Sequence, residues 1–263
     1  MLRYIKINLV LMRNSFIRDS QMPGYVISSF LWRILDITIS LIFFGVIFAN
    51  IQNLAGWNYW QVIFLYAFAR IIIVAHNAWT KRGIQSMATD LIRRGEFDFY
   101  LAKPVDPMIM VSIKSPRIYN FITLIFLIPL AIYAAIKSGV PIGLDNVIWF
   151  FILAGFGFIL YYFLMILCVI PAFWFIRLWT IAEIMDKLNT FMRYPAGIFS
   201  EGIKIAILVI FPIVTVSYFP AQILFYPPQP EYIVFMIFIT LLFGAVVRYL
   251  WSLGQRTYSS ASS

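Results

Sequence analysis

The sequence predicts an all-α polytopic membrane protein, with six membrane-embedded units in a single domain over residues 1–263. Of the 263 residues, 62% are hydrophobic and only 12% are charged, whereas a soluble domain is about half apolar and about a quarter charged. The apolar residues come in blocks of about 20, the length that a helix needs to cross a hydrocarbon core. The formal charge of +9 lies in the gaps on one side of these blocks, which argues against a nucleic-acid partner.

Residues 1–20 are predicted to form an amphipathic helix at the membrane interface, with its cations toward anionic headgroups. At 100° per residue, one arc of the helix carries Arg3, Lys6, Arg13, Asn14 and Arg18. The opposite face carries Leu2, Ile5, Leu9, Met12 and Phe16. The alternative is that these residues are the basic beginning of the first membrane span. We expect no cleavable signal peptide, because the cations interrupt any apolar core.

Five apolar blocks are predicted to span the membrane. They run from about Tyr25 to Asn50, Tyr59 to Thr80, Ile118 to Ile136, Val147 to Phe173 and Tyr232 to Leu253. The connecting loops 51–58 and 226–231 contain no Lys or Arg, whereas 81–117 contains seven. By the positive-inside rule, both termini and the 81–117 loop are expected to face the cytoplasm.

Residues 174–225 allow two interpretations. Hydropathy favours Ile205 to Phe225 as the fifth span, after a cytoplasmic loop. Alternatively, about Phe175 to Phe199 forms the span, and 204–225 folds back as a re-entrant hairpin that Pro212 and Pro220 break into half-helices. Such a hairpin is tolerated where protein covers the freed carbonyl groups. Both interpretations leave the last span in the same orientation.

No constellation for catalysis is present in the sequence. The chain has no G-x-x-x-x-G-K-[ST] phosphate loop, so we expect it neither to bind ATP nor to be an enzyme. His76 is the sole histidine, which leaves no metal motif and no catalytic triad, and a packing role suits it better. Cys168 is the sole cysteine and falls in an apolar block, so no intrachain disulfide can form.

Several charged residues fall inside the apolar regions, where each is costly unless it is paired. They are Arg33, Asp36, Arg70, Glu183, Asp186, Lys187 and Arg248. Arg33 and Asp36 are three residues apart and are predicted to neutralise each other. Arg70 and Arg248 lack local partners. A proton or ion relay is the functional interpretation, but internal pairing that holds the bundle together is favoured.

The charged stretch 93–107 interrupts the apolar pattern between the second and third spans. Gly95 is predicted to end the helix before it in a left-handed turn, and Asp106 with Pro107 to begin the next helix. Between them, aromatic residues alternate with acidic ones: Glu96, Phe97, Asp98, Phe99 and Tyr100. Acidic residues suit a protein partner better than anionic lipid, although a simple interfacial loop is the alternative.

At these residues the sequence resembles permease subunits of ABC-2-type exporters, in the six-span branch. The signature G-x-x-D-x-x-L-x-K/R-P-x-x-P is met by Gly95, Asp98, Leu101, Lys103, Pro104 and Pro107. A later signature is met by Tyr194-Pro195, by Pro212 and by the run from Ser217 to Tyr226. The order and spacing of the two signatures cover nearly the whole chain.

The resemblance implies a coupling role for residues 82–106, which would form a cytoplasmic coupling helix in a cleft of a separate ATPase. The implied contact residues are Arg94, Gly95, Glu96, Phe97, Asp98, Phe99, Leu101, Lys103 and Pro104. Residues 1–20 would be an interface helix that also rests on the ATPase. The resemblance also favours the re-entrant interpretation of 204–225.

The resemblance further implies the partners and the setting. The permease would pair with a second permease chain, as a homodimer or heterodimer, and with two ATPase subunits that bind ATP and Mg²⁺, while this chain binds no cofactor. It would lie among the lipids of the bacterial inner membrane and export a lipophilic or lipid-linked substrate. The rival hypothesis is a secondary transporter or channel that is not driven by ATP, which is expected to show an inverted repeat.

Overall fold

The computed structural model describes residues 2–175 and 179–258, and this part of the chain is helical apart from its connections. Five helices are long and apolar enough to cross a membrane. They are α2 (Pro23–Asn50), α3 (Tyr59–Trp79), η2 with α7 (Ile118–Thr123 and Leu124–Lys137), α8 with η3 (Leu144–Val169 and Ile170–Phe173) and α12 (Pro230–Thr257). These helices confirm the five predicted blocks.

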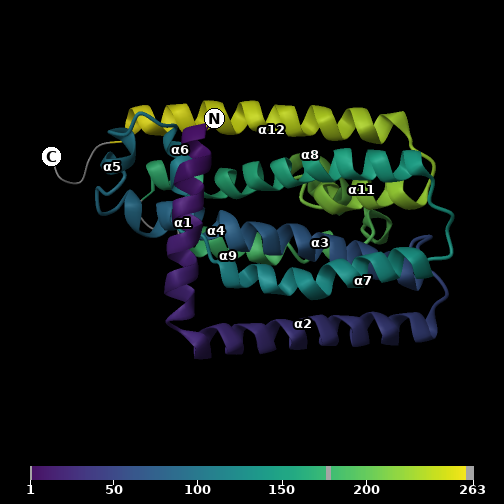
Figure 1. Ribbon diagram of the computed structural model, residues 1–263. Helices are drawn as coiled ribbons and strands as arrows, with labels where there is room; N and C mark the ends of the chain where they lie inside the picture. Colours follow the sequence, from purple (N-terminus) through teal and green to yellow (C-terminus); the bar gives the residue numbers. More distant parts are fainter. Residues whose placement is uncertain (1, 176–178, 259–263) are drawn as a thin grey trace.

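The long helices run side by side, while α1 (Leu2–Ser20) runs across their direction at one end of the bundle (Figure 1). We call this the basic end, because it also carries the Lys- and Arg-rich segment 81–117. Ser15 and Arg18 of α1 donate hydrogen bonds to the carbonyl of Pro116, at 2.5 and 2.8 Å. Leu9 and Phe16 are largely exposed, as expected of a helix at an interface. Of the residues predicted to form its two faces, Leu2, Arg3 and Ile5 have side chains outside the described part.

The centre of the bundle is α3, which packs against α7 and α11 (Thr215–Phe225), while α8 packs against α11 and α12. Asn58 and Gln61 form a capping box that fixes the beginning of α3. At its other end the chain continues through Thr80 into α4 (Lys81–Ser86). The Thr80 N–H donates to the His76 carbonyl, and the Thr80 carbonyl accepts from the Ile84 N–H. A movement of α4 is therefore linked directly to α3.

The bent pair before α12 begins and ends at the same end of the bundle. It consists of Glu201–Ile210 (α10, Glu201–Ile205, and the π-helix η6, Ala206–Ile210) and α11, which meet at 101°. Before it, Gly197 lies against Ala55, and after it the Tyr226 hydroxyl donates to the Gly56 carbonyl at 3.1 Å. Both contacts are with the 51–58 loop at the opposite end, which is the geometry of a re-entrant hairpin.

Two details of this region differ from the prediction. Pro220 does not break the hairpin: it lies inside α11, and the break occurs around Pro212. Residues 176–178 of the predicted span 175–199 lie outside the described part, and the rest is not one helix: α9 (Trp179–Leu188) is followed by the short 3-10 helices η4 (Phe191–Arg193) and η5 (Ala196–Ile198). The hydroxyl groups of Thr215 and Ser217 donate to the carbonyls of Leu208 and Met192, at 3.0 and 2.8 Å, which satisfies acceptors that the broken helices leave.

Candidate functional site

The segment between α3 and η2 is a compact helical unit at the basic end. It consists of α4, the π-helix η1 (Met87–Leu91), α5 (Asp98–Leu101) and α6 (Pro107–Ile113). Gly95 has a φ of 71° and turns the chain back, so that the Phe97 N–H donates to the Leu91 carbonyl at 3.1 Å. The Asp106 carboxylate accepts from the N–H groups of Met108 and Ile109 at the beginning of α6. Both predicted helix boundaries are confirmed.

The aromatic residues of this unit point to two different sides. Phe97 is fully buried, with its ring 5.5 Å from Phe173, 6.1 Å from Trp251 and 5.3 Å from Tyr258 between centroids. Phe99 is 70% exposed and faces away from the bundle. The sequence predicted both as contact residues, but in the structure Phe97 packs on η3 and α12 while Phe99 stays at the surface.

The other predicted contact residues lie around Phe99 at the surface. Arg94, Leu101, Lys103 and Pro104 are exposed, and Gly95, Glu96 and Asp98 are partly exposed. Arg94 forms ion pairs with Asp90 at 3.3 Å and with Glu96 at 4.0 Å. Lys103 and Lys114 lie 5.1 and 5.7 Å from the ring centre of Tyr100, and burial lowers the pKa of Lys114. We call Glu96, Phe99, Leu101 and Lys103 the loop face.

The charged residues predicted inside the membrane have other partners than expected. Asp36 pairs with Arg70 of α3, not with Arg33, whose guanidinium donates to Asn120 at 2.5 Å. Arg248 pairs with Asp106 at 2.5 Å. These pairings join different helices, because the rotation of each helix in the bundle decides which side chains meet.

The predicted group of Glu183, Asp186 and Lys187 is described only in part. Asp186 pairs with Lys81 of α4 at 2.6 Å, and Lys187 is exposed. The side chain of Glu183 lies outside the described part of the structure. His76 is buried, with its ring nitrogens 3.0 Å from the Thr80 hydroxyl and 3.1 Å from the Phe158 carbonyl. His76 therefore ties α3 to α8, which agrees with the packing role.

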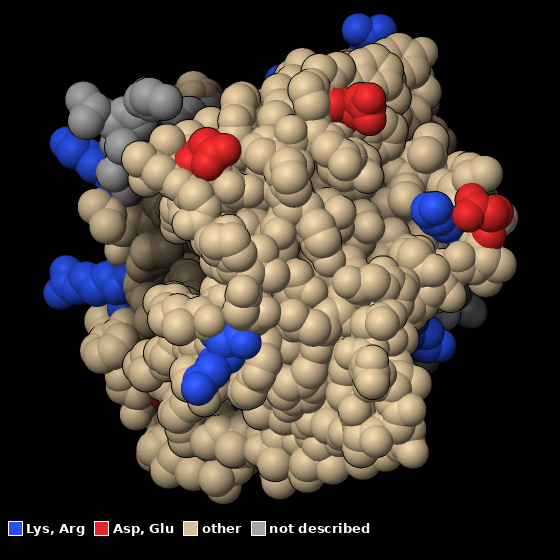
Figure 2. Space-filling view, turned by 90° about the vertical axis from the view of Figure 1, so that its right-hand side faces the viewer, with Lys and Arg blue, Asp and Glu red and all other residues tan. Residues whose placement is uncertain are grey.

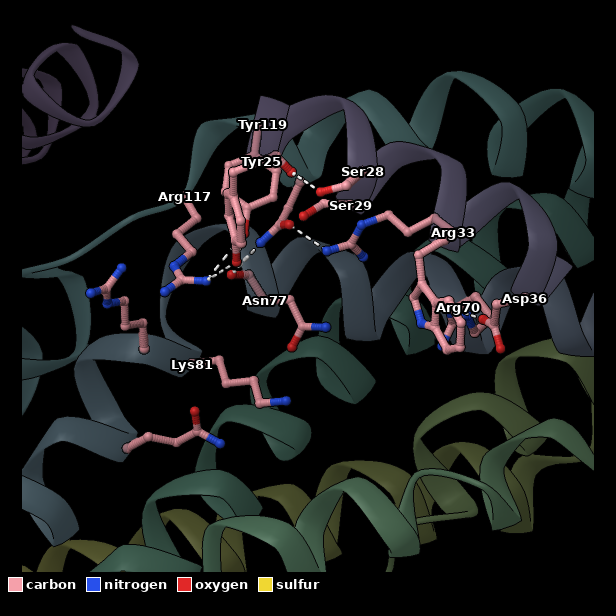
Figure 3. A pocket seen from close by; sticks show the side chains of 14 residues that line it. Tyr25, Ser28, Ser29, Arg33, Asp36, Arg70, Asn77, Lys81, Arg117 and Tyr119 are labelled. Carbon is pink, nitrogen blue, oxygen red and sulfur yellow. Dashed lines mark hydrogen bonds and ion pairs between the residues drawn. The ribbon is translucent and has the colours of Figure 1, made fainter. Parts of the chain in front are cut away.

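A polar cavity of about 630 Å³ lies between α2, α3, α4 and η2 (Figure 3). Its lining is rich in cations: Arg33, Arg70, Lys81, Arg82 and Arg117, with Asp36 as the one carboxylate. The rest of the lining consists of Tyr25, Ser28, Ser29, Trp32, Asn77, Gln85, Tyr119 and Asn120. This cavity was not predicted from the sequence, although the lack of a local partner for Arg70 indicated that a group on another helix lies near it.

Neutral groups hold two of the arginines in the cavity. Arg117 donates to the hydroxyl groups of Tyr25 and Tyr119 at 3.0 and 3.1 Å (Figure 3). The Asn120 side chain accepts from Arg33 and donates to the Asn77 carbonyl at 3.0 Å. The Asn77 side-chain oxygen and the Arg70 Nε are buried without a hydrogen-bond partner. The cavity therefore combines arginines held in defined positions with one buried acceptor and one buried donor that have no partner.

No group of three or more His, Cys, Asp or Glu residues that could hold a metal ion occurs in residues 2–175 and 179–258. In the comparison with protein families, a family model described as ABC-2 family transporter protein matches residues 34–262. Searches of curated proteins and of solved structures give no match.

Proposed function

Because the chain belongs to the ABC-2 family of transporter proteins, whose membrane components are not themselves ATPases, we propose that it is the permease subunit of an ATP-driven exporter. Permeases of ABC transporters generally pair with ATPase subunits, and in this proposal those subunits bind ATP and Mg²⁺. The observation that carries the proposal is the loop face, an exposed aromatic and charged surface on a helical unit at one end of the spans.

The basic end faces the cytoplasm in this proposal. The positive-inside rule supports this orientation, because 81–117 holds seven Lys and Arg residues whereas 51–58 and 226–231 hold none. The opposite end bears only a few scattered charges (Figure 2). Both termini, α1 and the loop face then lie on the side where ATP is available.

Movement of the ATPase would reach the spans by two connections. The loop face is joined to Phe97, which is packed on Phe173 of η3 and Trp251 of α12. The same unit is joined to α3 through Thr80 and α4. Only contacts that differ between the two ATPase states can shift the permease between conformations, and these connections give such contacts a mechanical path.

A second permease chain is part of the proposal, as a homodimer or a heterodimer. Its support is α2, whose 18-residue apolar stretch is only 6% buried in this chain. Exposed side chains along it include Leu31, Leu35, Ile39 and Ile42. Lipid or a second permease is expected to cover them.

The test is purification after mild solubilisation, with the ATPase identified among the co-purifying chains. Phe99→Asp is expected to lower the yield of co-purified ATPase about tenfold, because an exposed aromatic residue at the centre of a contact is replaced by a charge. Leu144→Asp is the matched control, since Leu144 is 78% exposed but lies at the first residue of α8, at the opposite end.

Two results would contradict the proposal in different ways. Equal ATPase yields from wild type and Phe99→Asp would place the contact elsewhere than on the loop face. If wild type itself purified without an ATPase after cross-linking in membranes, the exporter proposal would fail, and transport by an ion gradient would become the better hypothesis.

A further inference from the structure

The cavity between α2 and α3 is an elongated cleft that begins at the basic end. On α3 and its continuation α4, the lining residues run from Arg70 to Gln85, and the part from Arg70 to Lys81 alone corresponds to about 16 Å along a helix. On the other side it is bounded by α2, the least buried of the long helices. The cavity thus extends from the surface of the basic end into the depth of the spans, beside a helix that is open to lipid.

Its cations outnumber its carboxylates, and the existing ion pairs do not remove the excess. Arg70 is paired with Asp36, and Lys81 is paired with Asp186 from outside the cavity. In the part of the chain that the structure describes, no ion pair to a carboxylate joins Arg33, Arg82 or Arg117. Three guanidinium groups therefore line the same space without a carboxylate of the described residues in ion-pair contact.

The hydrogen bonds of these groups orient them without neutralising them. Arg33 donates to an amide and Arg117 to two tyrosine hydroxyls, so the charges stay while their positions are defined. Burial lowers the pKa of Arg82, and the nearby cations Arg117 and Arg18 lower it further. A bound anion would relieve this repulsion, and oriented guanidinium groups match the oxygen atoms of a phosphate.

An apolar surface adjoins the cationic one. Trp32 lines the cavity and is 72% exposed, and Leu31 and Leu35 beside it on α2 are 54% and 53% exposed. An inorganic anion or a soluble nucleotide would leave this apolar surface unused. A molecule with an anionic head and an apolar tail would use both surfaces at once.

We propose that this cavity binds the phosphate-bearing headgroup of an anionic amphiphile, with the apolar tail along α2. That the amphiphile is the transported substrate rests on the proposed function, but the binding itself does not. The cavity holds the headgroup at the basic end of the spans, where the amphiphile would leave the adjacent leaflet.

The experiment measures binding of a fluorescent phosphatidic acid to the purified full-length chain in nanodiscs of phosphatidylcholine, with no ATPase present. Saturable binding is expected for wild type. Arg33→Gln combined with Arg117→Gln is expected to raise the Kd about tenfold, because two charge-assisted hydrogen bonds are lost. Arg256→Gln is the matched control, since it removes an exposed cation at the basic end of α12 outside the cavity.

A second variant covers the case in which the double arginine variant does not fold. Ser28→Glu places a carboxylate at the rim of the cavity from an exposed position on α2 and leaves every arginine in place. It is expected to weaken binding of the phosphatidic acid by a similar factor. Unchanged binding by Ser28→Glu, or an equal loss by Arg256→Gln, would overturn the proposal in favour of general surface attraction.

Competition distinguishes the sources of the phosphate. Inorganic pyrophosphate is expected to compete only weakly, because it lacks the tail. If it displaced the lipid at equal concentration, the cavity would be a site for free phosphate, and the amphiphile would be excluded. Because the assay contains no ATPase, lipid binding by a chain that never co-purifies with one would sustain the site while the exporter proposal failed.

Discussion

Helices α2 and α3 are neighbours in sequence and both are apolar enough to span a membrane, yet their surroundings are opposite. An 18-residue stretch of α2 has a mean hydropathy of 2.0, and an 18-residue stretch of α3 has 1.6. Only 6% of that stretch of α2 is buried in the chain, against 72% of that of α3. The more apolar helix is thus the less buried one. Hydropathy measures the preference for the membrane and does not distinguish contact with lipid from contact with protein.

The polar residues of the two helices explain the difference in part. α3 carries Gln61 and His76, and both form hydrogen bonds with other protein groups. In hydrocarbon these groups need protein partners, so they favour the centre of the bundle. In α2 the two charged side chains, Arg33 and Asp36, line the cavity beside α3, and other parts of the helix expose apolar residues such as Ile39.

The largest expected difference between α2 and α3 is the loss of stability when a glycine is replaced by a larger residue. A Cβ on Gly83, in the continuation of α3, would lie 2.2 Å from the Val111 carbonyl oxygen, whereas a Cβ on Gly45 of α2 would meet nothing within 4 Å. Gly83→Leu is expected to lower the free energy of unfolding by about 4 kcal/mol, because α4 and α6 must separate. Gly45→Leu is expected to change it little. Unfolding in mixed micelles with increasing ionic detergent measures both, and equal effects would show that α4 does not pack on α6 in this way.

A smaller difference in stability is expected when an isoleucine of each helix is replaced by alanine. Ile63 of α3 is fully buried and Ile39 of α2 is 64% exposed. Ile63→Ala is expected to cost about 2 kcal/mol through lost packing contacts, and Ile39→Ala close to nothing in the detergent-purified single chain. The same unfolding titration decides this. A cost for Ile39→Ala that appears only in native membranes would reveal a partner on α2, and a large cost in the single chain would contradict its exposure.

Much of the fold was predictable because it depends on local sequence. Apolar length determines the spans, the Asp106–Pro107 pair determines the beginning of α6, and Gly95 determines the turn before Phe97. The amphipathic pattern of residues 1–20 likewise predicted α1. Each of these features requires only residues within a few positions of one another, so the sequence contains the whole cause.

The interactions between helices were less predictable. Local spacing paired Asp36 with Arg33, but the bundle turns Asp36 toward Arg70, 34 residues away in sequence. Phe97 and Phe99 are equivalent by composition, and only the turn at Gly95 sends the first inward and leaves the second outside. Predicting the cavity would have required both the helices themselves and the way they pack, because its residues come from α2, α3, α4 and η2. The partners of these side chains are therefore set by the packing of the helices and not by local sequence patterns.

The smallest expected effect concerns the ion pair that joins α2 to α3. The Asp36 and Arg70 side chains are 31% and 13% exposed, so solvent and lipid headgroups weaken their attraction only in part. A double-mutant cycle with Asp36→Asn and Arg70→Gln is expected to give a coupling energy of about 1 kcal/mol in the unfolding titration. Removing Arg70 also removes a buried Nε that has no partner, which reduces the cost of that single change.

The matched cycle replaces Arg70→Gln by Arg33→Gln. Because Arg33 donates to Asn120 instead of Asp36, its coupling to Asp36 is expected to be clearly smaller than that of Arg70. A larger coupling for Arg33 would restore the pairing along α2 that local spacing predicts. It would also mean that α2 is rotated away from α3, and the cavity between them would then lose Arg33 from its lining. The smallest energy in this series is thus the one that most directly tests how α2 lies on α3.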